Sequence, residues 1–161
     1  MNAACNASPL IVLAKAGLLE LLPALFEQVV VPQAVVAEIT AGGAGDPAVK
    51  ALRQAPWLQH VSLEPGVSAL AALQLGRGEA EVIEWALRHP DHIALLDDRA
   101  ARRVASVLGV QCAGTLRVLF EASRRGLLPS FAAGVQRLRD AGLYFDERTV
   151  QAVVRQAGGA E

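Results

Sequence analysis

The stretch IALLDDRAARRVASVLGVQCAG, residues 93–114, decides the fold. Its apolar beginning is typical of a buried strand, which runs into two aspartates, Asp97 and Asp98. The following DRAARRVASVLG predicts a helix closed by Gly109, and VQCAG predicts another strand. A strand, a helix and a strand in this order form a crossover between parallel strands. The stretch therefore predicts a parallel sheet with acidic residues at the carboxyl end of one strand.

The rest of the chain continues this alternation. Ser8 is expected to cap the first helix, with Pro9 as its first residue, and Asp46 to cap the helix that begins at Pro47. Further strands are expected at 2–6, 27–32 and 57–63, and further helices at 8–17, 18–26, 32–43, 45–55, 76–90, 115–128, 130–142 and 146–157. This order predicts an α/β fold, a three-layer α/β/α sandwich with a central parallel sheet. We expect one domain, residues 1–161, whose last two helices (about 130–157) form a C-terminal extension.

Composition narrows the class of protein. The chain has 161 residues, of which 53% are hydrophobic and 19% charged, so it is globular. Aromatic residues make up 4%, which argues against stacking of single-stranded bases as the main binding strategy. Lys15, Glu20 and Pro23 interrupt the apolar start, so neither a membrane span nor a signal peptide is expected. Two cysteines without a CxxC motif fit small buried side chains in a reducing cytoplasm.

Charge is distributed unevenly along the chain. The formal net charge is −1, yet every basic residue of the segment 97–161 is an arginine. Arginine suits phosphate recognition, but it is also common on helix surfaces. The pattern leaves phosphate binding and a solvated surface as equal alternatives.

Four acidic residues are candidates for a site. Active sites of open parallel sheets lie at the carboxyl ends of the strands, where Asp97 and Asp98 are expected. Asp98 also suits a helix cap, Glu38 is either a ligand or a solvent-facing residue, and Glu79 equally suits the first turn of its helix. Glu81 and Glu84 are expected to be surface groups.

Carboxylates gathered at one rim repel one another unless a cation lies between them. Their hard oxygen atoms suit Mg²⁺ or Mn²⁺, which would activate water and stabilise the charge of a reacting phosphodiester. The histidines lack the spacing of a zinc site. The chain has neither a phosphate-binding glycine loop nor a GxSxG elbow.

Five segments together resemble the PIN-domain family, most closely its small prokaryotic members similar to VapC toxins, a group that includes PIN domains of unknown function. The segments are ASPLIVLAKAGLLELL, VVVPQAVVAEI, LGRGEAEVIEWAL, IALLDDRAARRVA and GTLRVLFEASRRGLL. They span nearly the whole chain in order, and the combination LLDDRAAR…GTL after GEAE is the most specific part. The resemblance implies a divalent-metal ribonuclease that cleaves RNA with metal-activated water. It also implies a toxin that is silenced by a small antitoxin protein. Such toxins are commonly homodimers.

By position, the resemblance implies an acidic site made of residue 6, Glu38, Glu79, Asp97 and Asp98, with residue 6, Glu79, Asp97 and Asp98 as metal ligands. The family has an acid at the end of the first strand, whereas this chain has Asn6. Three explanations of Asn6 are open. It is a change introduced into the protein, a natural departure that weakens or inactivates the enzyme, or an amide whose carbonyl oxygen still binds the metal. Because Mg²⁺ relies on few direct protein ligands, we favour a weakened or inactivated site.

Four further residues are candidates for substrate binding. Ser8 would hydrogen-bond a metal-bound water or cap its helix, and Thr115 would touch a phosphate or, as we favour, cap the next helix. Arg99 and Arg102 share a helix face and would either clamp RNA phosphate or pair with surface glutamates. The main alternative to a nuclease is a non-catalytic module that binds RNA or protein. A phosphatase-like hydrolase is the weaker alternative, because it needs an acid at position 6.

Overall fold

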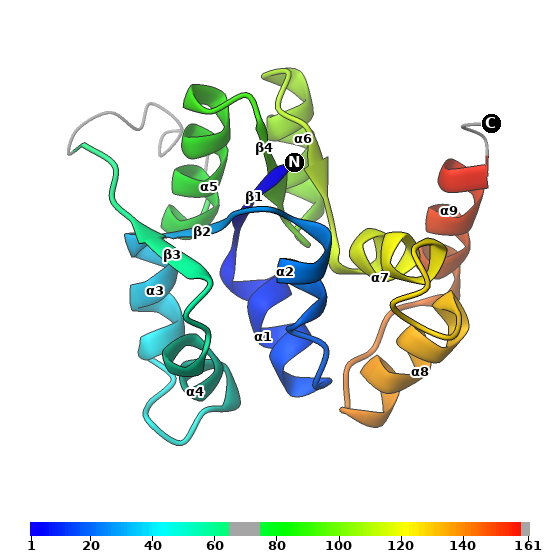
Figure 1. Ribbon diagram of the computed structural model, residues 1–161. Helices are drawn as coiled ribbons and strands as arrows, with labels where there is room; N and C mark the ends of the chain where they lie inside the picture. Colours follow the sequence, from blue (N-terminus) through cyan, green and yellow to red (C-terminus); the bar gives the residue numbers. More distant parts are fainter. Residues whose placement is uncertain (65–74, 159–161) are drawn as a thin grey trace.

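The structure is a computed structural model that describes residues 1–64 and 75–158 (Figure 1). Its described part contains a parallel sheet with the strand order β3-β2-β1-β4-β5. The strands are β1 (Asn2–Cys5), β2 (Val29–Pro32), β3 (Leu58–Val61), β4 (His92–Leu95) and β5 (Cys112–Ala113). The first strand lies in the centre, so the residues that follow β1 and β4 meet at one rim.

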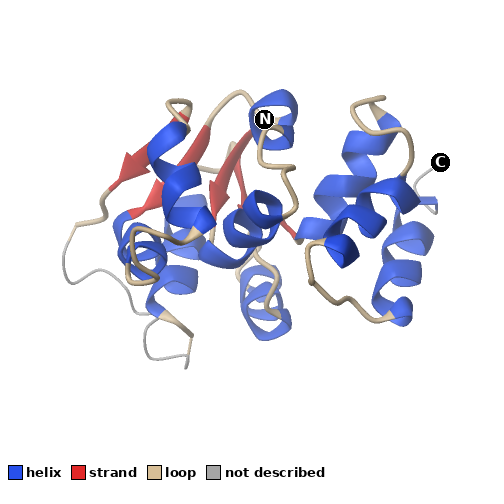
Figure 2. Cartoon of the chain, turned by 90° about the horizontal axis from the view of Figure 1, so that it is seen from below, coloured by secondary structure: helices blue, strands red, loops and turns tan. Residues whose placement is uncertain are grey.

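Helices cover both faces of the sheet, which gives the three layers expected from the sequence (Figure 2). On one face, α5 packs against β1, β2 and β4, with α3 and α6 as neighbours, whereas α1 lies among α3, α4 and α7. The helices are α1 (Ala7–Lys15), α2 (Leu21–Leu25), α3 (Gln33–Thr40), α4 (Pro47–Gln54), α5 (Arg77–Arg88), α6 (Arg99–Val107), α7 (Thr115–Arg124), α8 (Phe131–Asp140) and α9 (Glu147–Gly158). None of the described helices is long and apolar enough to cross a membrane.

The core explains why the inner strands of the sheet are mostly apolar, whereas edge strand β3 exposes Gln59 and His60. Parallel strands covered on both faces expose neither side to water, so alternation of polar and apolar residues is lost. Val29, Val30 and Val31 of β2 and Leu95 and Leu96 at the end of β4 are all buried.

The last two helices extend the molecule to one side of the sheet. Both α8 and α9 pack against α7, and Figure 1 shows them beyond the β5 edge. Asp146, just before α9, accepts hydrogen bonds from the backbone N–H and the hydroxyl of Thr149, each at 2.9 Å. The predicted extension is therefore anchored through α7 and begins with a side-chain cap.

Two sequence predictions about helix ends are confirmed. The Asp46 carboxylate accepts the backbone N–H of Ala48 at 2.8 Å, and Pro47 begins α4. Gly109 follows α6 with a φ of 75°, a left-handed conformation that glycine adopts without the steric cost of a Cβ atom.

The prediction that Ser8 caps the first helix is wrong. The helix α1 begins one residue earlier, at Ala7, and Asn6 occupies the cap position without a capping side-chain bond. The Ser8 hydroxyl instead donates to Asp97 Oδ2 at 3.2 Å. A nearby carboxylate accepts a stronger hydrogen bond than a neutral partner would, and this partner comes from a distant part of the chain.

Candidate metal and phosphate site

The site is built where β1 and β4 end side by side. Cys5 pairs with Leu95 in the parallel register, and the backbone N–H of Asn6 continues this ladder by donating to the Leu95 carbonyl at 3.1 Å. Two residues later, Asp97 leaves the same edge of the sheet. The rule that polar residues gather at the carboxyl ends of parallel strands thus places Asn6 and Asp97 on one rim.

Asn6 is a buried side chain with an unpartnered oxygen. The residue is 6% exposed, and its Oδ1 atom has no hydrogen-bond partner among the described residues. Leaving a buried acceptor unpaired costs about 1–3 kcal/mol, so this atom marks either a strained position or a place for a ligand.

Glu38 of α3 reaches the same place as Asn6. A Cβ atom added to Gly78 would lie 2.9 Å from Glu38 Oε2 and 3.1 Å from Asn6 Oδ1. Both oxygen atoms therefore approach one backbone position at the start of α5, and a Cβ atom there would displace them. The GRGEAE segment contains this glycine, but its role depends on contacts that the sequence does not show.

Glu79 follows Gly78 in the first turn of α5. Its Oε2 atom accepts the backbone N–H of Gly76 at 3.1 Å. Burial is the largest cause that raises the pKa of this carboxyl; the Gly76 bond lowers it, and the negative charges of Asp98 and Glu38 raise it further. Glu79, Asp98 and Glu38 are thus close enough for their charges to interact.

Asp97 is held by three hydrogen bonds. Its Oδ1 accepts the backbone N–H of Thr115 at 2.7 Å, and its Oδ2 accepts the hydroxyls of Thr115 at 2.7 Å and Ser8 at 3.2 Å. These donors connect the ends of β1 and β5 to β4 and fix the orientation of the carboxylate. Burial raises the pKa of the neighbouring Cys5 thiol, and the negative charge of Asp97 raises it further.

Asp98 acts as a helix cap. Its carboxylate accepts the backbone N–H of Ala101 at 2.8 Å, so the capping interpretation is confirmed. The residue is exposed at the rim and contributes to the raised pKa of Glu79. Capping uses one carboxylate oxygen and leaves the negative charge of Asp98 close enough to act on Glu79.

The acids share a rim but do not close around one point. Within residues 1–64 and 75–158, no three His, Cys, Asp or Glu side chains are placed together so that they could hold a metal ion. The donor set is nevertheless all oxygen, which fits a hard divalent cation, and Asn6 supplies a buried oxygen with no other partner. The Asn6 oxygen is thus the rim atom whose chemistry and burial best fit a ligand for such an ion.

The candidate substrate-binding residues Thr115 and Arg102 make contacts that differ from those predicted from the sequence. Thr115 does not cap α7: Gly114 is at the cap position, and the Thr115 hydroxyl binds Asp97. Arg102 forms no ion pair with a glutamate in the described part of the chain; its guanidinium donates to the carbonyls of Leu96 and Asp97. Arg99 is exposed and makes no ion pair with the described residues.

The prediction that Glu81 and Glu84 are surface groups is wrong. Their side chains are only 14% and 13% exposed. Glu81 Oε2 accepts the backbone N–H of Ala34, in the first turn of α3, at 3.0 Å, whereas Glu84 pairs with Arg88 within α5. The contact of Glu81 with α3 depends on how the two helices pack, which the pattern of α5 alone does not reveal.

These features define an α/β/α protein with an acidic rim at the carboxyl end of a parallel sheet. Residues 2–159 match the family DUF3368, described as a PIN domain. The chain therefore belongs to this PIN-domain family.

A solved structure supports the fold. It is a PilT N-terminus domain protein from the hyperthermophilic archaeon Sulfolobus solfataricus, with a TM-score of 0.51 and 16% identity over 73% of this chain and 90% of that one. Comparison with curated proteins gives no significant match.

Proposed function

We propose that this protein is a divalent-metal-dependent endoribonuclease of low activity. The observation that carries the proposal is the buried, unpartnered Asn6 oxygen beside Glu38, on the rim that also holds Asp97. Membership of the PIN-domain family supports a nuclease or a module with the same fold. The proposed catalytic residues are Asn6, Glu38, Glu79, Asp97 and Asp98.

Mg²⁺ or Mn²⁺ would be held by Asn6, Glu79, Asp97 and Asp98. When bound, the metal supplies activation of water and neutralisation of negative charge on the phosphodiester. Ser8 and Thr115 orient the Asp97 carboxylate by hydrogen bonding, which keeps its oxygen atoms in one position. Exposed Arg99 would attract RNA phosphate, and the guanidinium of Arg102 holds the carbonyl groups at the end of β4.

Asn6 accounts for the low activity. An amide in place of a carboxylate removes one negative charge from a site that has few protein ligands, which weakens divalent metal binding. It also removes a like charge from beside Glu38, which stabilises the metal-free protein.

The proposal extends to a biological role. The resemblance to VapC-like toxins supports a toxin controlled by a small antitoxin protein, active in the cytoplasm as a homodimer. Both cysteines are free, in keeping with a reducing compartment.

The test restores the acid. We expect Asn6→Asp to cleave single-stranded RNA with Mn²⁺ and to stop when EDTA is added, while the unmodified protein cleaves little. Adding Glu38→Gln to Asn6→Asp should abolish the gained cleavage. Gln54→Glu is the control: it adds the same negative charge at an exposed position of α4 and should leave RNA cleavage unchanged.

Calorimetric titration with Mn²⁺ separates the alternatives. Tighter metal binding by Asn6→Asp together with metal-dependent cleavage supports the nuclease. Absence of cleavage in both forms, with RNA binding unaffected by metal, would instead identify a non-catalytic RNA-binding module. This role is favoured because no three acids of residues 1–64 and 75–158 are placed to hold a metal ion.

A further inference from the structure

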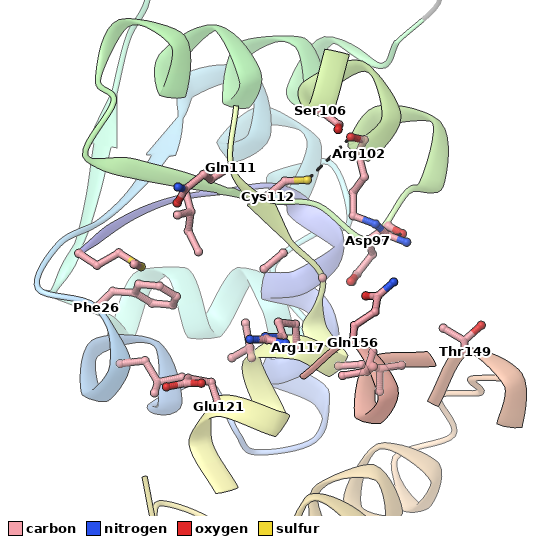
Figure 3. A pocket seen from close by; sticks show the side chains of 18 of the residues that line it. Phe26, Asp97, Arg102, Ser106, Gln111, Cys112, Arg117, Glu121, Thr149 and Gln156 are labelled. Atoms are coloured by element: carbon pink, nitrogen blue, oxygen red, sulfur yellow. Dashed lines mark hydrogen bonds between the residues drawn. The ribbon is translucent and has the colours of Figure 1, made fainter. Parts of the chain in front are cut away.

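A pocket of about 920 Å³ runs along β5, the edge strand of the sheet (Figure 3). We call it the β5–α9 pocket, because β5 lies along one side and α9 along the other. Its lining includes Asp97, Arg102, Cys112, Arg117, Phe145 and Gln156. Asp97 belongs both to this lining and to the acidic rim, so the pocket adjoins the rim, and Figure 3 shows Gln156 of α9 directed toward Asp97.

The edge of β5 offers the pocket a free main-chain donor and acceptor. The carbonyls of Gln111 and Ala113 face β4, where they accept the N–H groups of Ala94 and Leu96, each at 2.9 Å. Main-chain groups of alternate residues point to opposite edges of a strand, so the N–H and C=O of Cys112 point away from β4. Neither group is paired with a described residue.

The pocket also contains an arginine, Arg117, that has no acidic partner in the described part of the chain. Arg117 of α7 is half-buried, and its guanidinium lies 5.7 Å from the centre of the Phe120 ring. It makes no ion pair with the described residues, whereas Arg125, also in the pocket, pairs with Glu121 at 3.1 Å. A planar guanidinium in a partly apolar pocket is a strong phosphate ligand.

We propose that the β5–α9 pocket holds the nucleotide next to the scissile phosphate of the RNA. The inference rests on the proposed nuclease function: a strand whose phosphate lies at Asp97 continues into the pocket that Asp97 lines. The N–H and C=O of Cys112 read the edge of the base, Arg117 binds a phosphate, and apolar groups such as Phe145 contact the ring face. This pocket would therefore determine which base the protein prefers next to the cleavage site in the RNA.

An extended peptide is the competing occupant, because a strand can add to the free edge of β5. The unpaired charge of Arg117 and the continuity with the acidic rim favour the nucleotide. A β-strand peptide needs several consecutive main-chain pairs, whereas β5 has two residues and only Cys112 faces outward.

The Cys112 thiol provides a readout that needs no catalysis. Cys5 is fully buried, so N-ethylmaleimide should modify Cys112 alone in the folded protein. The probes are four homopolymeric RNA hexamers, one for each base, in EDTA. We expect at least one hexamer to slow modification about tenfold at saturation, and one base type to protect best. A synthetic peptide of alternating valine and glutamate serves as the competing ligand.

A pair of variants on α7 tests the phosphate contact. Arg117→Gln should weaken binding of the protective hexamer about fivefold, as expected for loss of one charged phosphate contact. Arg124→Gln, an exposed residue beside Glu121, should bind it normally. Three outcomes would overturn the proposal. The hexamers bind without protecting Cys112, the peptide alone protects Cys112, or the two variants bind the hexamer equally well. If hexamers protect Cys112 but Asn6→Asp never cleaves, the nuclease function falls and the nucleotide pocket stands.

Discussion

The Asp97 carboxylate and Thr115 are joined twice, through the backbone N–H and the hydroxyl of Thr115, both at 2.7 Å. Thr115 is fully buried, so neither bond can be replaced readily by water. This pair connects the end of β4 to the start of α7 and fixes one proposed metal ligand.

Thr115→Val keeps the size of the side chain but removes its hydroxyl. We expect a loss of about 1–3 kcal/mol in the free energy of unfolding, because the Asp97 carboxylate loses a buried partner. Thr115→Ser should recover most of this loss. Urea denaturation in EDTA measures both; a Val variant as stable as the Ser variant would show that the hydroxyl bond contributes nothing.

Glu81 provides a second test of a contact between distant segments. Glu81→Ala removes the acceptor of the Ala34 N–H and should cost about 1–2 kcal/mol. The matched change, Glu84→Ala, breaks the ion pair with Arg88 within α5, as Glu81→Ala breaks one with Arg77, but it leaves no backbone N–H without its acceptor and should cost less. Chemical denaturation that ranks the two variants in the opposite order would contradict this account.

The fold was predictable from the sequence because its signals are local. The apolar run before Asp97, the proline after Asp46 and the glycine at 109 each act through their nearest neighbours. The common rim of Asn6 and Asp97 was predictable as well, because parallel strands bring their carboxyl ends to one edge.

Hydrogen-bond partners were not predictable in the same way. Ser8 and Thr115 have the sequence context of helix caps, yet both bind Asp97, which comes from a strand between theirs in the sheet. Glu81 looked exposed because its partner, Ala34, belongs to another helix. Such choices depend on which elements pack together, and a single helix pattern does not contain that information.

A side chain at Gly78 should displace the groups that surround it. In Gly78→Ala, the new Cβ atom would lie 2.9 Å from Glu38 Oε2 and 3.1 Å from both Asn6 Oδ1 and a Val35 methyl group. We expect a loss of about 1–3 kcal/mol from overpacking. In the Asn6→Asp background, Mn²⁺ affinity should fall because Glu38 and residue 6 are displaced.

Gly45→Ala is the matched control, since no atom lies within 4 Å of its added Cβ. This variant should keep its stability or gain about 0.4–1 kcal/mol from the stiffer unfolded chain. Thermal unfolding and Mn²⁺ calorimetry distinguish the two variants. Equal behaviour would mean that the rim tolerates a side chain at position 78.

Acid should weaken the attachment of α9 through Asp146. The backbone N–H of Thr149 is the largest cause that lowers the pKa of this carboxyl below its ordinary value of 3.8, and the Thr149 hydroxyl adds to the effect. A lowered pKa in the folded state means that the ionised cap stabilises the protein above the ordinary pKa. This contribution is lost as the pH falls from about 4 through the lowered value.

Asp146→Asn should therefore flatten the stability profile between pH 5 and 3 relative to the unmodified protein. Urea midpoints over this range measure the difference. Asp140→Asn, a change at the exposed end of α8 that leaves the Thr149 cap intact, is the control and should keep the original slope. Parallel profiles for all three proteins would show that the Thr149 contacts do not favour the ionised carboxylate of Asp146, and that the start of α9 does not depend on its charge.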